Sequence, residues 1–213
     1  MHGVPRRSSG SEAMTPPGDA QWIDAVAATF VSYRRMIDGA VSQLSDAELM
    51  ARPRADMSSV AVVLRHLGGN LRSRWSDFLT TDGEKPDRDR DGEFADWDGD
   101  RESLMSFFSS GWDALTDALR TIDATTMRQP VFIRGERHSV ADALLRSLTH
   151  VAYHVGQIMV IARMAHGGEW NWLTIPPGGS LQHNAKTWGA AASRGEPEAR
   201  ISPTHPRDAT NLR

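Results

Sequence analysis

The sequence THVAYHVGQ (residues 149–157) places two histidines four residues apart within a run that has a helical apolar pattern. Four residues advance an α-helix by about 400°, so His150 and His154 lie on one face, one turn apart. Two imidazoles at this separation can bind one first-row divalent metal ion, because such ions favour neutral ring nitrogens. A third ligand must then come from elsewhere in the chain.

The rest of the chain predicts partners for this helix. Apolar residues recur at helical spacing in four long segments. The predicted helices cover residues 19–44, 59–79, 101–122 and 140–164. Together they contain most of the apolar residues, so the sequence predicts an all-α fold built as a four-helix bundle.

The segments between the helices carry turn residues. Ser45 followed by Glu48 predicts a capping box and a short turn of helix after the first long helix. Residues 80–100 are rich in Asp, Gly, Arg and Pro and predict a long loop. Residues 130–138 predict a small β-hairpin between the third and fourth long helices, with Gly135 at its turn.

The composition indicates one domain with unstructured ends. Residues 1–18 and 189–213 lack an apolar period and are expected to be disordered tails on either side of a bundle domain at 19–188. The net charge of −3 and the scattered basic residues argue against nucleic-acid binding. No apolar run approaches the ~20 residues that span a bilayer, and no secretory signal is recognisable. We therefore expect a soluble, cytoplasmic protein without a membrane partner.

The chain contains no cysteine, which limits the chemistry of any metal site. A disulfide framework, a thiolate metal site and a cysteine nucleophile are all excluded. Any metal ion must therefore be held by histidine, carboxylate, amide or water.

His66 is the strongest candidate for the third ligand. It lies in the middle of the second predicted helix, within an apolar stretch where an unpartnered imidazole would have to be desolvated. Three histidines that leave one position open are typical of a catalytic metal site, and zinc, nickel, iron or manganese would each fit. The alternative is that each histidine is a hydrogen-bonded core residue without a metal.

The histidine pair is similar to the helix motif of metalloproteases, but one residue differs. That motif needs a Glu directly after the first histidine to activate water, and Val151 occupies this position. A peptidase of this class is therefore not expected. Any base must come from elsewhere or from metal-bound water.

Polar residues near the histidines are candidates for substrate binding. Asn70 lies one turn after His66, Gln157 lies three residues after His154, and Arg146 lies one turn before His150. Asn70 and Gln157 are expected to orient ligands or substrate, and Arg146 to pair with an anionic group. Alternatively, Arg146 is a solvated helix residue and the amides are ordinary boundary groups. Tyr153 is expected to be a packing residue.

A second metal motif lies in the long loop. Asp87, Asp89 and Asp91 precede Gly92, and Asp98 stands at the twelfth place, which is the spacing of a calcium-binding loop. Pro86 interrupts the helix that would enter such a loop, and Asp98 replaces the usual bidentate Glu. Alternating Arg and Asp residues that neutralise each other in a solvated loop are the favoured interpretation.

The order of these motifs resembles the DinB-like superfamily of metal-binding four-helix proteins, which includes bacillithiol transferases and mycothiol-dependent enzymes. The resemblance covers roughly residues 19–185 and rests on RHLGGN (residues 65–70) and HVAYHVGQ (residues 150–157). The segments TTDGEKP (80–86), RDRDGEF (88–94) and WLTIPPGGS (172–180) resemble a subfamily of unknown function.

The resemblance implies an up-down-down-up bundle, a metal ion on His66, His150 and His154, and a homodimer. Characterised members of the superfamily include thiol-dependent S-transferases and isomerases, in which the metal lowers the pKa of a thiol. The leading expectation is a metalloenzyme that activates a low-molecular-weight thiol for S-transfer to an electrophile. The alternatives are a hydrolase that uses metal-bound water and a non-catalytic, stress-associated metal-binding protein.

Overall fold

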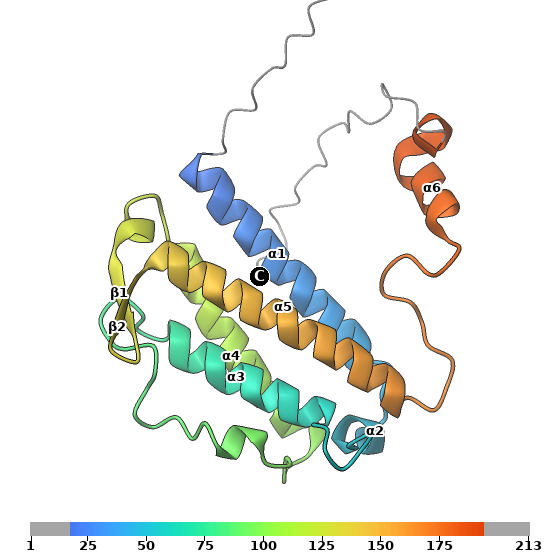
Figure 1. Cartoon of the computed structure of the whole chain (residues 1–213), viewed down its shortest axis with the longest axis horizontal. Helices are drawn as coiled ribbons and strands as arrows, with labels where there is room; N and C mark the ends of the chain where they lie inside the picture. The colour runs from blue at the N-terminus through green and yellow to red at the C-terminus, as the bar shows by residue number, and fades with distance from the viewer. Residues whose placement is uncertain (1–17, 194–213) are drawn as a thin grey trace, which may run out of the picture. The chain divides into compact units, whose positions relative to one another are not determined.

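The computed structural model describes residues 18–193, which are mostly helical with one two-stranded sheet (Figure 1). The elements in chain order are α1 (Asp19–Val41), α2 (Asp46–Met50), α3 (Val60–Trp75), η1 (Gly92–Phe94), α4 (Arg101–Thr121), η2 (Thr126–Arg128), β1 (Pro130–Ile133), β2 (Glu136–Ser139), α5 (Val140–Ala165) and α6 (Ser180–Ser193). The prediction of a mostly helical chain with a small hairpin before the helix that carries His150 and His154 is therefore confirmed. Of the tails expected at 1–18 and 189–213, residues 1–17 and 194–213 lie outside the described residues.

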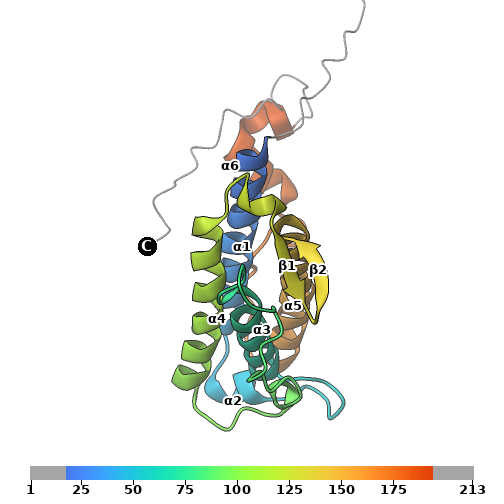
Figure 2. The same cartoon turned by 90° about the vertical axis from the view of Figure 1, so that its left-hand side faces the viewer.

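The helices α1, α3, α4 and α5 lie alongside one another, and the hairpin stands at one end of them (Figures 1 and 2). Helices α3 and α5 run antiparallel: His66 in α3 meets His150 in α5, whereas Trp75 at the end of α3 donates to Ser147 Oγ at 2.9 Å. Because the two helices are antiparallel, residues that follow one another every four positions along α3 lie opposite residues that recur every four positions along α5 in the reverse order.

Two glycines let α3 and α4 approach closely. A Cβ atom at Gly111 would lie 2.2 Å from the backbone oxygen of Gly68, and a Cβ atom at Gly68 would lie 3.0 Å from Phe108 Cα. Any side chain at Gly111 would therefore push the two helices apart. Buried leucines and aromatic rings fill the space on either side, among them Leu64, Leu67, Leu71, Leu104, Phe108 and Leu115.

Local sequence signals fix where the two histidine-bearing helices begin. Ser59 Oγ accepts a hydrogen bond from the backbone N–H of Val62 at 3.2 Å and so caps α3. Ser139 and Asp142 form a capping box at the start of α5. The hairpin directly before α5 turns through Arg134 and Gly135, whose φ angles of 56° and 76° suit the tight two-residue turns of hairpins.

The predicted helix ends differ from the observed ones at two places. Helix α1 ends at Val41 although Leu44 is buried, and α3 ends at Trp75 although Phe78 is buried. Apolar residues just beyond each helix thus pack into the core from turns. An apolar pattern cannot distinguish this case from a longer helix.

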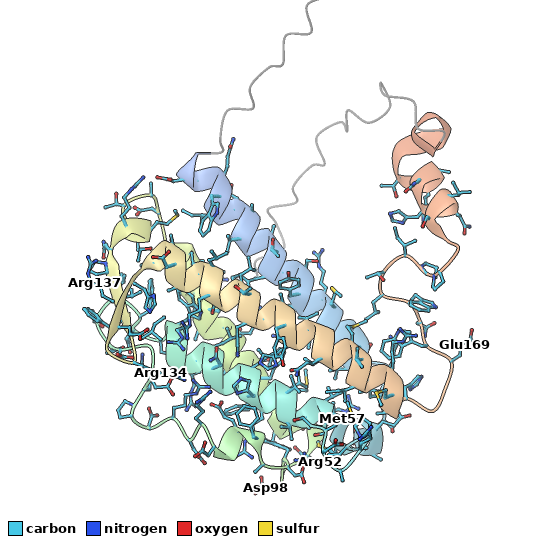
Figure 3. All side chains as sticks on the ribbon, viewed as in Figure 1. Arg52, Met57, Asp98, Arg134, Arg137 and Glu169 are labelled. Carbon is cyan, nitrogen blue, oxygen red and sulfur yellow. The ribbon has the colours of Figure 1, made fainter. Side chains whose placement is uncertain are left out.

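The long loop after α3 is attached to its neighbours by hydrogen bonds. Ser73 Oγ donates to the backbone oxygen of Gly83 at 2.9 Å, and the N–H of Gly83 donates to the backbone oxygen of Phe132 in β1 at 2.8 Å. Asp82 accepts hydrogen bonds from the backbone N–H groups of Arg134, which is labelled in Figure 3, and of Gly135. The loop is therefore held between α3 and the hairpin turn.

The chain after Gly168 forms a second compact unit, which contains α6. Helix α6 is not among the predicted helices, and it extends into the tail predicted from residue 189 onward. Gly189, at φ 84°, interrupts the helical backbone, and three alanines with high helix propensity follow it. Within residues 18–193, no helix combines the length and the apolar character that crossing a membrane requires.

Candidate metal centre

The antiparallel helices α3 and α5 bring three histidines together. One ring nitrogen from each of His66, His150 and His154 lies within 4.8 Å of the others. His66 and His154 are buried and His150 is half-buried. Helix α5 supplies two of the rings from successive turns, as the spacing predicts, and α3 supplies the third.

The three rings point the same nitrogen at a common centre. His150 Nε2 lies 3.2 Å from His66 Nε2 and 3.1 Å from His154 Nε2. Nitrogen ligands around a tetrahedral zinc ion, at zinc–nitrogen distances of about 2.0 to 2.1 Å, are separated by about 3.3 to 3.4 Å. The rings are therefore already close to the separation that a shared metal ion requires.

A buried carboxylate fixes the orientation of His66. Nδ1 of His66 lies 2.9 Å from Glu93 Oε2, and Arg88 donates to both oxygens of that carboxylate at 2.8 and 2.7 Å. Burial raises the pKa of Glu93, but the hydrogen bonds from Arg88 and His66 outweigh it, and the pKa lies below its usual value. Glu93 therefore stays ionised and accepts the Nδ1 proton of His66, which leaves Nε2 with a free lone pair.

Gln157 fixes His154 in the same way. Nδ1 of His154 lies 2.6 Å from Gln157 Oε1, while Gln157 Nε2 donates to the hydroxyl of Tyr153 at 3.1 Å. This chain of hydrogen bonds makes the amide oxygen the acceptor and places the proton of His154 on Nδ1. Its Nε2 atom therefore also presents a lone pair to the centre.

The donor set fits a metal ion better than it fits hydrogen bonds alone. Two lone pairs, from His66 and His154, face His150 Nε2, and one proton on that atom can satisfy only one of them fully. His150 Nδ1 is shielded from solvent and has no hydrogen-bond partner among residues 18–193. A cation at the centre would satisfy all three Nε2 atoms, so these residues can hold a divalent metal.

The protonation states agree with this fit. Burial, and then the neighbouring histidines, lower the pKa of His150 from 6.5 to about 3. Burial and His66 lower the pKa of His154 to about 4, although its hydrogen bond to Gln157 acts in the opposite direction. Both rings are therefore neutral at physiological pH, which is the form that binds metals.

A cavity of about 550 Å³ opens beside the histidines. Each residue that the sequence analysis proposes for substrate binding lines it: Asn70 from α3, and Arg146 and Gln157 from α5. Gln157 also orients His154, which is one of the two roles expected for it. The volume is sufficient for a small-molecule ligand next to the metal position.

Comparison with known proteins identifies a family but no activity. The model of the family described as "Protein of unknown function (DUF1572)" matches residues 18–179, which include all three histidines and the cavity. The chain belongs to this family. No curated protein and no solved structure matches it.

In this DUF1572 protein, the sequence analysis missed the residue that orients His66. Glu93 lies in η1, within the long loop, and reaches α3 at Gly69, where a Cβ atom would be 2.1 Å from Glu93 Oε1. Phe94 next to it stacks on the His66 ring at a centroid distance of 4.6 Å. Glu93 lies in a loop, 27 positions after His66, so no periodic pattern in the sequence links the two residues. The one available signal is Gly69, because a glycine in the middle of a helix indicates that another part of the chain approaches closely.

The structure also bears on the expectations for Tyr153 and for the calcium-loop spacing between Asp87 and Asp98. Tyr153 packs its ring against that of His154 at a centroid distance of 5.0 Å, but the residue is 64% exposed and lines the cavity. The carboxylates between Asp87 and Asp98 do not converge into a group that could hold an ion. Asp89 instead accepts a hydrogen bond from the backbone N–H of Gly92 at 2.9 Å.

Proposed function

We propose that this DUF1572 protein is a DinB-like metalloenzyme that activates a low-molecular-weight thiol for S-transfer to an electrophile. In this proposal His66, His150 and His154 hold one zinc, nickel, iron or manganese ion and leave a position open toward the cavity. The observation that carries the proposal is the convergence of three imidazole Nε2 atoms beside that cavity.

The packing of the helices supports a DinB-like up-down-down-up bundle. Helix α3 is antiparallel to α5 through the contacts of His66 and Trp75 described above. The ends of α1 and α5 lie close together, because Glu48 just after α1 accepts a hydrogen bond from Gly167 just after α5. Asp19 at the start of α1 pairs with Arg128, just before the hairpin that leads into α5. Helices α1 and α5 therefore point the same way, and α3 points the opposite way.

The lining of the cavity gives a hydrolase no base other than metal-bound water itself. Its residues include the three histidines and four arginines but no Asp or Glu, so the cavity offers no carboxylate as a general base for hydrolysis. When bound at the histidines, a divalent metal would lower the pKa of a thiol at the open position. The thiol brings its own nucleophilic sulfur, which a chain without cysteine lacks.

The residues of the chain would orient the reactants of this transfer. The thiol releases its proton to solvent, a bond forms between its sulfur and the electrophilic carbon, and the leaving group departs with the electrons of the broken bond. Glu93 and Gln157 keep the imidazoles of His66 and His154 in place during this reaction. Phe94 and the cavity wall limit the access of water to the His66 side.

Metal analysis of protein purified without a histidine tag is the first test. We expect about one equivalent of a transition metal in the wild type and a large loss in the variants His150→Ala and His154→Ala. His183→Ala changes a histidine outside the cluster and should keep the metal. Equal metal content in all four proteins would remove the metal site from the proposal.

Thiol binding and turnover then test the chemistry. Cobalt-substituted protein should gain a sulfur-to-metal charge-transfer band when a thiol such as cysteine or glutathione is added. Electrophiles should be converted only in the presence of a thiol. Turnover that is independent of thiols would instead support a hydrolase, and bound metal with no turnover under either condition would support the non-catalytic metal-binding protein.

A further inference from the structure

The charged side chains that line the cavity beside the histidines, apart from the histidines themselves, are all positive. Four arginines line it, Arg74, Arg90, Arg134 and Arg146, and no carboxylate does. The whole chain has a net charge of −3, so this cluster does not reflect a basic protein. A concave site lined by one sign of charge concentrates ligands of the opposite sign.

Arg74 is the member of this group whose position is hardest to explain without a ligand. Its side chain lies at the end of α3 and only 8% of the residue is exposed. Nη1 is shielded from solvent, and the guanidinium forms no hydrogen bond or ion pair with any residue in the range 18–193. Burial, and then the nearby Arg146, lower the pKa of Arg74 to about 10, so the group is still charged at neutral pH.

The chain makes room for this guanidinium without supplying a counterion. Arg74 packs over Gly83, where a Cβ atom would lie 2.9 Å from Nη1. The negative charge of Glu84 attracts Arg74 at longer range and raises its pKa. The carboxylate of Glu84, however, forms its ion pairs with Arg88 at 3.3 Å and with Arg134 at 3.2 Å. A buried, unpaired charge is costly, and a bound anion would offset that cost.

Helical spacing places Arg74 in line with the metal position. His66, Asn70 and Arg74 follow one another at intervals of four residues on α3. On α5, Arg146 precedes His150 and His154 at the same interval. Because the two helices are antiparallel, both arginines lie on the same side of the histidines. The rise of an α-helix sets the separation from His66 to Arg74 at about 12 Å along the axis.

We propose that the cavity binds an anionic small molecule whose carboxylate or phosphate group pairs with Arg74 and Arg146. The guanidinium of Arg74 offers several N–H donors in the planar arrangement that matches such oxyanions. The remainder of the molecule extends toward the histidines, and this part of the inference rests on the proposed function. The substrate or the thiol of the reaction therefore carries an acidic group.

Anion titrations of the full-length, metal-free protein test the site separately from the metal. Inorganic phosphate and malonate serve as probes for the two oxyanion chemistries. Calorimetry reports binding, as does tryptophan fluorescence, to which Trp75 next to Arg74 contributes. We expect saturable binding of one or both probes, and we expect Arg74→Met to weaken it by about 10- to 100-fold, as for the loss of a charge-assisted hydrogen bond. Arg74→Lys should give an intermediate affinity, because it keeps the charge but loses the planar donors.

Matched variants separate a specific site from general electrostatics. Arg35→Met removes the same charge from an exposed position on α1 and should leave the affinity for both probes unchanged. His150→Ala should lose the metal but keep the binding of the probe. Equal affinity in the wild type and Arg74→Met, or equal weakening by Arg35→Met, would overturn the inference. A wild-type protein that binds the probe but retains no metal would refute the proposed function and leave the anion site intact.

Thermal unfolding distinguishes a binding role of Arg74 from a structural one. Met keeps most of the aliphatic length of Arg, so Arg74→Met removes an unpaired buried charge with little loss of packing. If the guanidinium serves a ligand, this variant should unfold at the same or a higher temperature than the wild type without a probe. It should also lose the stabilisation that phosphate or malonate gives to the wild type. A clear loss of stability in the probe-free protein would assign Arg74 a structural role and overturn the inference.

Discussion

At the scale of single residues, Glu93 decides which nitrogen of His66 faces the metal centre. Replacing it by Gln removes the negative charge that accepts the Nδ1 proton and leaves Arg88 without its bidentate partner. We expect Glu93→Gln to weaken metal binding by about 10- to 100-fold, as is typical for the loss of a partner that orients a ligand. Competition with a chelating dye measures this affinity.

The control for this prediction is an exposed glutamate. Glu102→Gln, in the first turn of α4, makes the same chemical change away from the histidines and should leave metal affinity unaltered. An affinity of Glu93→Gln equal to that of the wild type would show that the carboxylate does not orient the ligand. Circular dichroism of both variants reports whether the fold is kept.

The pH dependence of stability follows from His150 and His154. Their pKa values lie at about 3 and about 4 in the folded chain, whereas the ordinary value is 6.5. Between pH 6.5 and about 4.5 the unfolded chain therefore binds up to about two protons at these positions that the folded chain does not. The free energy of unfolding of the metal-free protein should fall as the pH is lowered through this window.

Urea denaturation at several pH values measures this slope. The double variant His150→Ala/His154→Ala lacks both groups and should show a clearly flatter dependence, whereas His183→Ala should follow the wild type. An unchanged slope in the double variant would mean that these two imidazoles are not held neutral by folding.

At this scale, the sequence reveals some residues of the site and conceals others. His150 and His154 are recognisable because one helix carries both, and His66 because it is a titratable group in an apolar stretch. Glu93 and Arg88 lie in a loop whose path depends on tertiary contacts, so no spacing rule relates them to His66. Arg74 also looks like an ordinary helix residue until its burial and its lack of a partner are known.

At the scale of elements, the close contact between α3 and the long loop depends on Gly69. A Cβ atom there would overlap Glu93, so Gly69→Ala should displace η1 from the helix. We expect a loss of about 1 to 3 kcal/mol of stability, as for overpacking of a buried contact, together with weaker metal binding. Chemical denaturation and the dye competition give the two values.

Gly156 provides the matched control for this helix position. A Cβ atom at Gly156 meets nothing within 4 Å, so Gly156→Ala should gain up to about 1 kcal/mol from higher helix propensity. Its metal affinity should stay at the wild-type value. If both alanine variants were stabilised, the contact between Gly69 and Glu93 would not be tight in solution.

The helices themselves are the elements that the sequence predicts best. The starts of α3 and α5, at Val60 and Val140, lie within one residue of the predicted starts, and the hairpin turns at Gly135 as predicted. The ends are less predictable, because Leu44 and Phe78 are buried without belonging to a helix. Burial depends on what packs from other elements, and the local pattern does not contain that information.

At the scale of the whole molecule, two neighbouring faces of α5 differ in character. One face carries the histidines and lines the cavity. A neighbouring face exposes four apolar side chains, each between 52 and 64% exposed: Leu145, Tyr153, Val160 and Met164. Their spacing along the helix keeps them within an arc of about 100°, so they form one stripe. Exposed apolar side chains gathered on one face of a helix are typical of a surface that contacts another protein.

We predict that this stripe joins two copies of the chain, as the resemblance to DinB-like proteins implies. Light scattering after gel filtration should give twice the mass of one chain, and Val160→Lys should shift the protein to the monomer, because a charge at the centre of an apolar contact must be desolvated. Ser106→Lys adds the same charge to an exposed position on α4 and should leave the dimer intact. Tyr153 belongs to both the stripe and the cavity rim, so dimerisation should also alter access to the cavity. A wild-type protein that is monomeric at high concentration would contradict this assignment of the stripe.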